Sequence, residues 1–254
     1  MSVFLSGFAS LVGHFADLLQ PLFQGGATAA AIVLFTACVR LAVHPLSRAS
    51  ARGQKARTKL SPQIAALRKK HSKNPERLQK AIMELHKKEK VSPLSGCLPS
   101  LLQLPAFFLM YHLFSSREIG GEPNELLGHS LGAAPLGDRW KDALADGGIF
   151  GGAGLVYVAL FVVVVAVATF NYRRTKRQMA AMPTPTAGPD GQPMPGMGAM
   201  TKLMPLMSFA TIITVGVVPL AAALYVVTST TWTAVERAFL YRDVPAAGAL
   251  ATAA

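Results

Sequence analysis

Long apolar tracts alternate with charged segments along this chain. Four of the tracts approach or exceed the roughly 20 residues that an α-helix needs to cross a bilayer. They lie at 26–47, 96–115, 149–172 and 203–235. The last tract holds 33 residues without a charge, about 50 Å as one helix, which is too long for a single crossing. Gly216 and Pro219 lie near its middle, so we expect a tight helical hairpin there.

The pattern therefore predicts an all-α membrane protein with a bundle of five transmembrane helices. We assign the spans to residues 26–47, 96–115, 149–172, 201–217 and 219–240. Pro99 and Pro105 fall inside the second span, where neighbouring helices can satisfy the carbonyl groups that a proline leaves free.

Residues 1–25 have a different pattern, with apolar residues at helical spacing and few charges. The apolar positions are Phe4, Phe8, Leu11, Phe15, Leu18 and Leu19. No Lys or Arg occurs in this segment, so it lacks the basic region of a secretory signal peptide. We expect an N-terminal amphipathic helix on the extracytoplasmic membrane surface. An uncleaved signal-anchor is the alternative.

Composition agrees with a membrane protein. Of the 254 residues, 51% are hydrophobic and 15% are charged, whereas about 25% of residues are charged in a soluble domain. The net charge is +12, and such a basic chain favours anionic partners such as lipid headgroups, RNA or acidic protein.

The charges are distributed unevenly, and their placement predicts the orientation. Residues 48–95 hold fourteen Lys and Arg and three Glu, 116–148 hold three basic and six acidic residues, and 173–200 hold four basic residues and one Asp. Basic segments stay in the cytoplasm. We therefore expect 48–95 and 173–200 inside, 116–148 outside, the N-terminus outside, and the tail 241–254 in the cytoplasm.

The basic segment 48–95 has helical periodicity of its own. Its apolar residues recur at helical spacing in two sets, Leu60, Ile64 and Leu67, then Leu78, Ile82 and Leu85. Ser61-Pro62 and Asn74-Pro75 each have the pattern of an N-cap residue followed by proline at the first helical position. We predict a cytoplasmic helical hairpin with arms at about 50–71 and 75–91.

So many cations in one segment favour a docking surface. The candidate partner-binding residues are Arg68, Lys69, Lys70, Lys73, Arg77, Lys80, Lys87 and Lys88. Anionic lipids and ribosomal RNA phosphates both fit this charge. A solvated surface that only fixes topology is the alternative. The segment has no aromatic residue, which argues against stacking on bases.

Arg40 is a charge inside the first predicted span. Such a charge costs at least about 2.5–3.5 kcal/mol to insert, unless the side chain reaches the headgroups. Polar residues accompany it on three spans, namely Thr36, Gln103, Tyr225, Thr228, Ser229, Thr230, Thr231 and Thr233. Snorkelling to the headgroups is one reading, and a water-filled groove that holds a polar peptide segment is the other.

Motifs of enzymes and metal sites are absent from the sequence. The six histidines have no metal-ligand spacing, no nucleotide-binding loop occurs, and no Ser–His–Asp arrangement can be argued. No acidic residue interrupts the apolar tracts, which argues against a proton-coupled transporter. We predict no enzyme activity and no cofactor. Cys38 and Cys97 are expected to be small buried residues.

Four stretches in order resemble the YidC-type membrane protein insertase family. They are 38–46 with Arg40 and Pro45, the basic segment 50–91, 93–111 with Gln103, and 204–225 with Pro219 and Tyr225. In that family, the matching arginine lies in a groove, and the matching proline ends the first span. The absence of a large periplasmic domain is similar to the family's short bacterial form.

The resemblance implies a specific activity. A five-helix core would receive nascent membrane proteins in a hydrophilic groove, open to cytoplasm and lipid, and release their hydrophobic segments into the bilayer without nucleotide hydrolysis. Arg40, Thr36, Gln103 and Tyr225 would line the groove, and the basic hairpin would contact the ribosome or the signal-recognition receptor. Some members work beside the Sec translocon. The expected location is the bacterial plasma (inner) membrane.

The chain departs from the family pattern near its C-terminus. Val226 replaces an aromatic residue, and Glu236 follows a Ser/Thr-rich stretch where amides are common in the family. The tail is short and uncharged after Val244. Two other functions stay open on the residues alone: a membrane anchor or assembly factor that recruits ribosomes, and a small anion channel.

Overall fold

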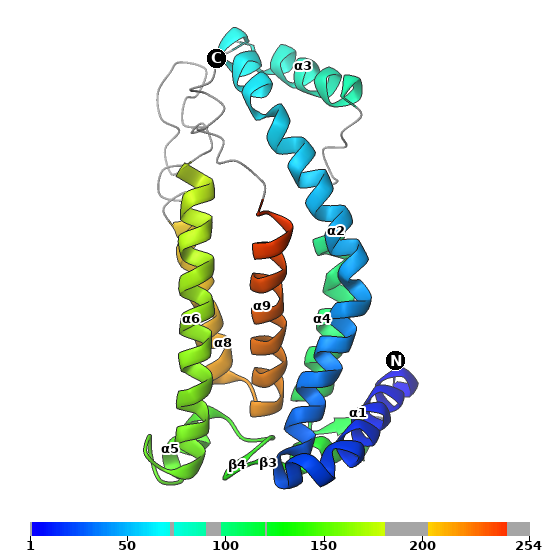
Figure 1. The fold of residues 1–254 in the computed structure, drawn as a ribbon, viewed down its shortest axis with the longest axis vertical. Helices are drawn as coiled ribbons and strands as arrows, with labels where there is room; N and C mark the ends of the chain where they lie inside the picture. Colours follow the sequence, from blue (N-terminus) through cyan, green and yellow to red (C-terminus); the bar gives the residue numbers. More distant parts are fainter. Residues whose placement is uncertain (1, 72–73, 90–97, 120, 181–202, 243–254) are drawn as a thin grey trace. The chain divides into compact units, whose positions relative to one another are not determined.

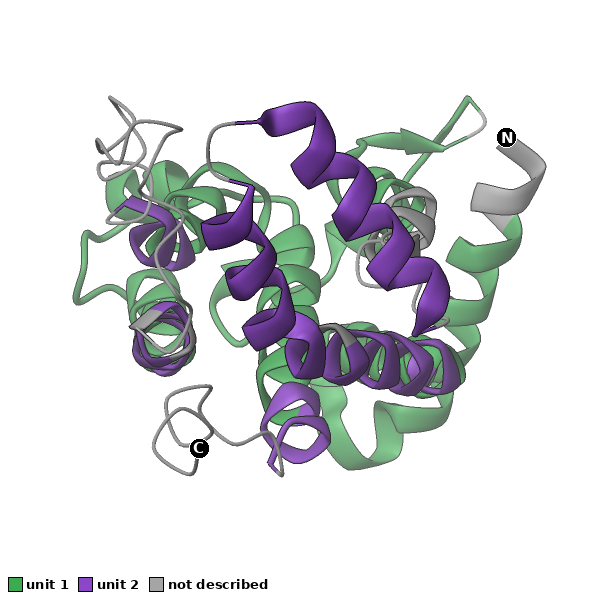
Figure 2. Cartoon of the chain, turned by 90° about the horizontal axis from the view of Figure 1, so that it is seen from above, with its two compact units in different colours: residues 1–43, 103–169, 209–235 green, residues 44–102, 170–208, 236–254 purple. Residues whose placement is uncertain are grey.

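The computed structural model describes residues 2–71, 74–89, 98–119, 121–180 and 203–242, and the side chains of 2–6, 57, 98–106, 178 and 180 lie outside this description. Helices dominate the described part (Figure 1). The chain forms two compact units, coloured separately in Figure 2. Unit 1 comprises residues 1–43, 103–169 and 209–235, and unit 2 comprises 44–102, 170–208 and 236–254.

One short turn separates the first two helices of the chain. Helix α1 covers Ser2–Phe23, the 3₁₀ turn η1 covers Gln24–Gly26, and α2 covers Ala27–Lys70. Within unit 1, the rings of Phe8 and Phe15 of α1 lie against Phe35 of α2, with centroid distances of 5.8 and 6.5 Å. Leu18 and Leu22 of α1 are strongly exposed. Helix α1 is therefore apolar both toward α2 and on its open side.

Helix α2 corrects two expectations about prolines. It runs through Pro45 and Pro62 as one 44-residue helix (Figure 1), so Pro45 does not end it and Ser61-Pro62 does not start a new one. Each proline removes one backbone hydrogen bond. The surrounding residues 48–70 are rich in Ala, Lys, Arg and Gln, whose helix propensities favour continuation.

The next helix starts where the sequence predicts it. Helix α3 covers Pro75–Lys88, and the Asn74 side chain accepts a hydrogen bond from the Arg77 backbone N–H at 3.0 Å. The N-cap and the proline at the first position are thus as predicted. Helix α4 then covers Leu98–Ser115.

Two small β-hairpins follow α4, in the segment predicted as a loop. Strands β1 (Glu118–Ile119) and β2 (Glu122–Pro123) pair antiparallel, as do β3 (Ser130–Leu131) and β4 (Ala134–Pro135). Gly121 and Gly132 supply the positive φ angles of the two turns, +94° and +60°. The 3₁₀ turn η2 (Glu125–Gly128) and the short helix α5 (Trp140–Ala145) complete this segment.

The C-terminal helices include the predicted break at Pro219. Helix α6 covers Gly152–Ala180, η3 covers Met207–Phe209, α8 covers Ala210–Val217 and α9 covers Leu220–Leu240. The backbone N–H groups of Leu220 and Ala221 donate to the carbonyls of Asp138 and Leu136 at 2.8 and 2.9 Å. These bonds satisfy donors that the first turn of α9 cannot pair internally.

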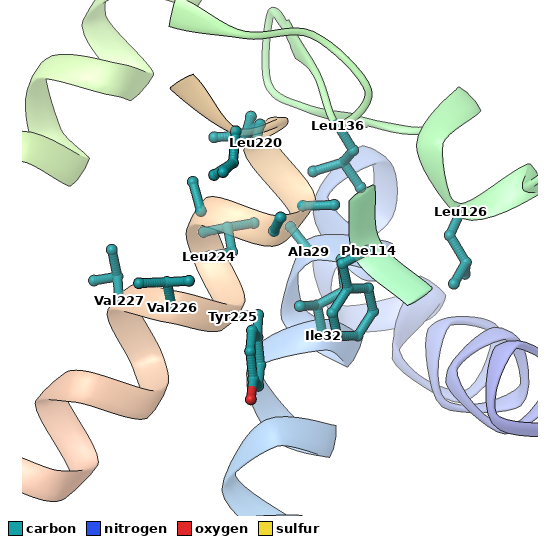
Figure 3. Close-up of a cluster of buried hydrophobic side chains, with 14 of the residues drawn as sticks. Ala29, Ile32, Phe114, Leu126, Leu136, Leu220, Leu224, Tyr225, Val226 and Val227 are labelled. Carbon is teal, nitrogen blue, oxygen red and sulfur yellow. The ribbon is translucent and has the colours of Figure 1, made fainter. Parts of the chain in front are cut away.

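The core of unit 1 surrounds the start of α9. Every residue from Leu220 to Val227 is buried, so this part of the helix is covered on all sides. Figure 3 shows Tyr225 of this stretch beside Ile32 of α2 and Phe114 of α4. The Tyr157 hydroxyl of α6 donates to the Asp138 carbonyl at 2.6 Å, which anchors the connecting segment.

Two helical stretches in the described part of the chain are long and apolar enough to cross a membrane. They are the continuous run Gly7–Lys70 and the segment Gly152–Arg177. In the segment Gly152–Arg177, only 28% of the most apolar 18-residue stretch is buried inside the protein. Val162, Val163 and Phe170 of this segment are exposed. A core helix of a soluble protein would bury these side chains, so their exposure fits a lipid-facing surface.

Candidate functional site

Arg40 lies on α2 and is partly buried. One of its guanidinium N–H groups donates to the Oγ atom of Ser229 on α9, 189 residues away in sequence. Ser229 is almost fully buried, with 3% exposure. A charged donor inside an apolar bundle is tolerated only when its hydrogen bonds are satisfied, and Ser229 provides one such acceptor.

Tyr225 belongs to the same polar cluster. It lies one helical turn before Ser229, and both the charge of Arg40 and the Ser229 side chain act on its phenol group. Its ring packs against Phe107 and Phe114 of α4, with centroid distances of 6.0 and 5.9 Å. In Figure 3, the Tyr225 oxygen points away from the labelled apolar side chains. The structure therefore brings Arg40 and Tyr225 together, and Ser229 links them.

The other predicted polar residues have different environments. Thr36 is buried, and its hydroxyl donates to the Ile32 carbonyl at 2.7 Å, so its donor is used within its own helix. Thr230 and Thr233 likewise donate to carbonyls of α9. Gln103 lies on α4, but its side chain is outside the described residues.

Two buried polar atoms of α9 have no hydrogen-bond partner in the described part of the chain. They are Oγ1 of Thr231 and Nε1 of Trp232. A buried donor without a partner costs about 1–3 kcal/mol. Sequence reasoning included Thr231 among the polar residues of this helix but missed Trp232, because an indole in an apolar helix is usually read as core.

Unit 2 contains a contact between a histidine and a carboxylate that the sequence does not predict. Nδ1 of His44 on α2 lies 2.5 Å from Oε1 of Glu236 on α9, and the side-chain exposures are 35% and 9%. The two residues are 192 positions apart, so no local pattern links them. The only signal in the sequence was that Glu236 is the first charged residue after the apolar tract 203–235, and that His44 follows Arg40 by one helical turn.

The basic residues lie at exposed positions near helix ends. Arg68, Lys69 and Lys70 form the last turn of α2, and Lys87 and Lys88 end α3. Cations there interact favourably with the negative end of the helix dipole. Arg77 and Lys80 of α3 are also exposed. Lys73 lies outside the described residues.

Apolar residues of α3 share one side of the helix. Leu78, Ile82 and Leu85 are half-buried there, and His86 is buried.

The expectation that Cys38 on α2 is buried is wrong, because this residue is exposed, whereas Cys97 lies outside the described residues. Within the described residues, no group of His, Cys, Asp and Glu has the arrangement of a metal site.

Comparison with known proteins gives a family match over most of the chain. The family model described as "60Kd inner membrane protein" matches residues 19–247. Relatives named "Membrane protein insertase YidC" are also similar. The protein from Clostridium perfringens is 40% identical over 109 residues, which is 43% of this chain and 42% of that protein.

Two further relatives with the same name match shorter shares of their own length. The protein from Polynucleobacter asymbioticus is 40% identical over 101 residues, which is 39% of this chain and 18% of that protein. The protein from Pelagibacter ubique is 46% identical over 81 residues, which is 32% of this chain and 14% of that protein. The chain thus covers less than half of the length of each of these relatives.

Proposed function

Because this chain belongs to the 60Kd inner membrane protein family, we propose that it is a membrane protein insertase of the bacterial inner membrane. Relatives named as insertases at about 40% identity support this activity. The substrates would be nascent membrane proteins. Five helices would span the bilayer at 26–47, 96–115, 149–172, 201–217 and 219–240, with the N-terminus outside and the C-terminus inside.

The contact between Arg40 and Ser229 is the observation that carries the proposal. It joins a guanidinium group in the apolar N-terminal part of α2 to a buried hydroxyl of α9. In the proposed mechanism, this cluster lines a hydrophilic groove together with Tyr225, Thr36 and Gln103. An acidic or polar segment of the substrate replaces Ser229 as the partner of Arg40, because a carboxylate binds a guanidinium more strongly than a hydroxyl does.

The two buried donors on α9 that have no partner among the described residues support the same proposal. A polar substrate segment, or water that accompanies it, supplies partners for Thr231 and Trp232. Apolar substrate segments then move along the exposed apolar surface of the helices into lipid. Burial of the apolar segment in lipid drives this transfer, so the mechanism needs no nucleotide hydrolysis.

The exposed cations of α2 and α3 would be the docking surface for partners. The proposed partners are the ribosome, the signal-recognition receptor, the Sec translocon and anionic lipids. Eight candidate residues for this contact are Arg68, Lys69, Lys70, Lys73, Arg77, Lys80, Lys87 and Lys88. Their phosphate-binding capacity would not depend on base sequence.

Complementation tests the proposed activity. Cells depleted of their own insertase receive the wild type, Arg40→Ala, Arg40→Lys or the matched control Arg48→Ala, with protein levels checked. Arg48 is an exposed arginine two turns later on α2. We expect the wild type and the control to restore insertion of a small client with an acidic extracytoplasmic segment, and Arg40→Ala to fail.

The other outcomes separate the alternatives. Rescue by Arg40→Lys would show that a positive charge suffices without the planar guanidinium. A stable wild type that inserts no client would contradict the insertase proposal and favour a ribosome anchor or an anion channel. Equal rescue by Arg40→Ala would retain the activity but remove Arg40 from its mechanism.

A further inference from the structure

Unit 2 holds a polar cavity of about 220 Å³, lined by the interior of α2, the C-terminal part of α6 and the end of α9. Gln54 of α2, Asn171 and Arg174 of α6, and Arg237 of α9 contribute to its lining. Ser208, in the turn before α8, and Tyr241, just after α9, also line the cavity. These side chains offer guanidinium, amide and hydroxyl groups, all of which can donate hydrogen bonds.

Among the described residues, the lining of the cavity includes two cations and no anion. Arg174 and Arg237 lie close enough to repel each other electrostatically, and none of the described residues that line the cavity carries a carboxylate. Glu236, the nearest acidic residue in sequence, is paired with His44. Among the described residues, no ion pair with a carboxylate involves either arginine. Two arginines that share a cavity without a carboxylate favour an anionic ligand, and phosphate oxygens match the guanidinium geometry.

Tyr241 contacts two of the other residues that line the cavity, Gln54 and Arg174. Its hydroxyl donates to Oε1 of Gln54 at 2.5 Å, which ties the end of α9 to α2. The guanidinium carbon of Arg174 lies 5.3 Å from the centroid of the Tyr241 ring, within the range of a cation–π contact. A cation–π contact does not neutralise the guanidinium charge, so Arg174 can still donate hydrogen bonds to the oxygen atoms of an anionic ligand.

The position of the arginines in sequence indicates the depth of the cavity in the bilayer. Residues 147–172 contain no charge, and Arg173 and Arg174 follow directly. Residues 203–235 contain no charge, and Glu236 and Arg237 follow directly. The first charges after an apolar span lie at the headgroup level. A lipid phosphate at the same level reaches the cavity without leaving the membrane.

We propose that this cavity binds the phosphodiester headgroup of an anionic phospholipid. The ligand phosphate accepts hydrogen bonds from Arg174 and Arg237, and Asn171 and Ser208 donate to its remaining oxygens. Basic pockets between helices at the cytoplasmic side of a membrane are suited to anionic headgroups. This site is separate from the exposed cations of α2 and α3, and it does not depend on the proposed insertase activity.

Native mass spectrometry of the full-length protein tests this site. The protein is released from detergent micelles after incubation with phosphatidylglycerol, cardiolipin or phosphatidylethanolamine. We expect the wild type to retain the two anionic lipids in preference to phosphatidylethanolamine. Arg174→Gln and Arg237→Gln should each weaken retention of phosphatidylglycerol at least about fivefold. The matched controls Arg173→Gln and Arg242→Gln remove exposed arginines outside the cavity and should change retention less than about twofold.

Three results would overturn the proposal. Equal retention of phosphatidylethanolamine by the wild type would show that the anionic headgroup is not recognised. Equal losses of phosphatidylglycerol retention in the cavity variants and the control variants would show that the lipid responds only to the general surface charge. Displacement of the lipid by excess inorganic phosphate, with equal thermal stabilisation by phosphate alone, would identify a soluble-phosphate site. Circular dichroism establishes that each variant is folded, and Arg174→Lys supplies a milder variant if Arg174→Gln is not.

Discussion

At the scale of single residues, the Arg40–Ser229 hydrogen bond should contribute to stability as well as to function. Ser229→Ala removes one acceptor of the Arg40 guanidinium in an apolar bundle, where each lost hydrogen bond of a charged group is costly. We expect a double-mutant cycle with Arg40→Ala to give a coupling energy of about 0.5–2 kcal/mol. The measurement is unfolding of the purified protein in mixed micelles.

The control for this cycle lies on the same helix. Thr233 donates to the Ser229 carbonyl, within α9, so Thr233→Ala should not couple to Arg40→Ala. A coupling energy near zero for Ser229, or an equal value for Thr233, would show that the contact does not stabilise the bundle.

Ionisation of Tyr241 should make the stability of the folded protein depend on pH. Burial raises the pKa of the Tyr241 phenol above its ordinary value of about 10, while Arg237 and Arg174 lower it and the net shift is upward. The neutral phenol is therefore favoured in the folded protein. Its stabilising contribution is complete below about pH 10 and is lost as pH rises through the folded-state pKa.

The tyrosinate absorbance of the wild type minus that of Tyr241→Phe measures this titration. In Arg237→Gln, a cation that favours the phenolate is gone, so the titration should move to still higher pH. A shift to lower pH would mean that Arg237 does not act on the phenol directly.

At the scale of secondary-structure elements, the start of α3 depends on Asn74. Its side chain satisfies the Arg77 backbone N–H, and loss of such a cap costs about 0.5–2 kcal/mol. We expect Asn74→Ala to speed hydrogen exchange of the first amides of α3, while Asn74→Ser retains most protection. Gln79→Ala, at an exposed position inside α3, is the control and should leave exchange nearly unchanged. Equal exchange in Asn74→Ala and the wild type would show that the cap is dispensable.

Sequence patterns predicted helix starts better than helix continuations. The Asn74-Pro75 cap and the break at Pro219 both follow from local backbone chemistry. Ser61-Pro62 was misread because the same residue pair can start a helix or lie within one, and the choice depends on propensity over many residues. Pro45, which the family resemblance implied would end the first span, also lies inside α2. The strands at 118–135 have two residues each, too short for alternation to appear.

The candidate site could be predicted only in part for a related reason. Arg40 was recognisable because a charge in an apolar tract is costly wherever it lies. Its partner was not, because Ser229 is 189 residues away and several hydroxyls on α9 were equivalent in sequence. The His44–Glu236 pair and the cavity at Arg174 and Arg237 likewise depend on helix packing, which the order of residues does not display.

At the scale of the whole molecule, the asymmetry of charge predicts a single orientation in the membrane. Most of the net charge of +12 lies in 48–95, and 116–148 is acidic overall. Translocating the basic segment would oppose the positive-inside rule. We therefore expect 116–148 to lie outside and 48–95 inside, with an odd number of crossings between the N-terminus and the tail.

Cysteine labelling in intact cells tests this orientation. Cys38 and Cys97 are first replaced by serine, and single cysteines are introduced as Glu122→Cys or Lys88→Cys, both at exposed positions. A membrane-impermeant maleimide should label Glu122→Cys in intact cells and Lys88→Cys only after lysis. The opposite labelling pattern would show that the protein has the inverted orientation in the membrane. In that orientation, the groove at Arg40 would open to the extracytoplasmic side, and the basic segment could not contact the ribosome. Because the groove must open toward the side where substrates are synthesised, this single measurement constrains the proposed function as well as the fold.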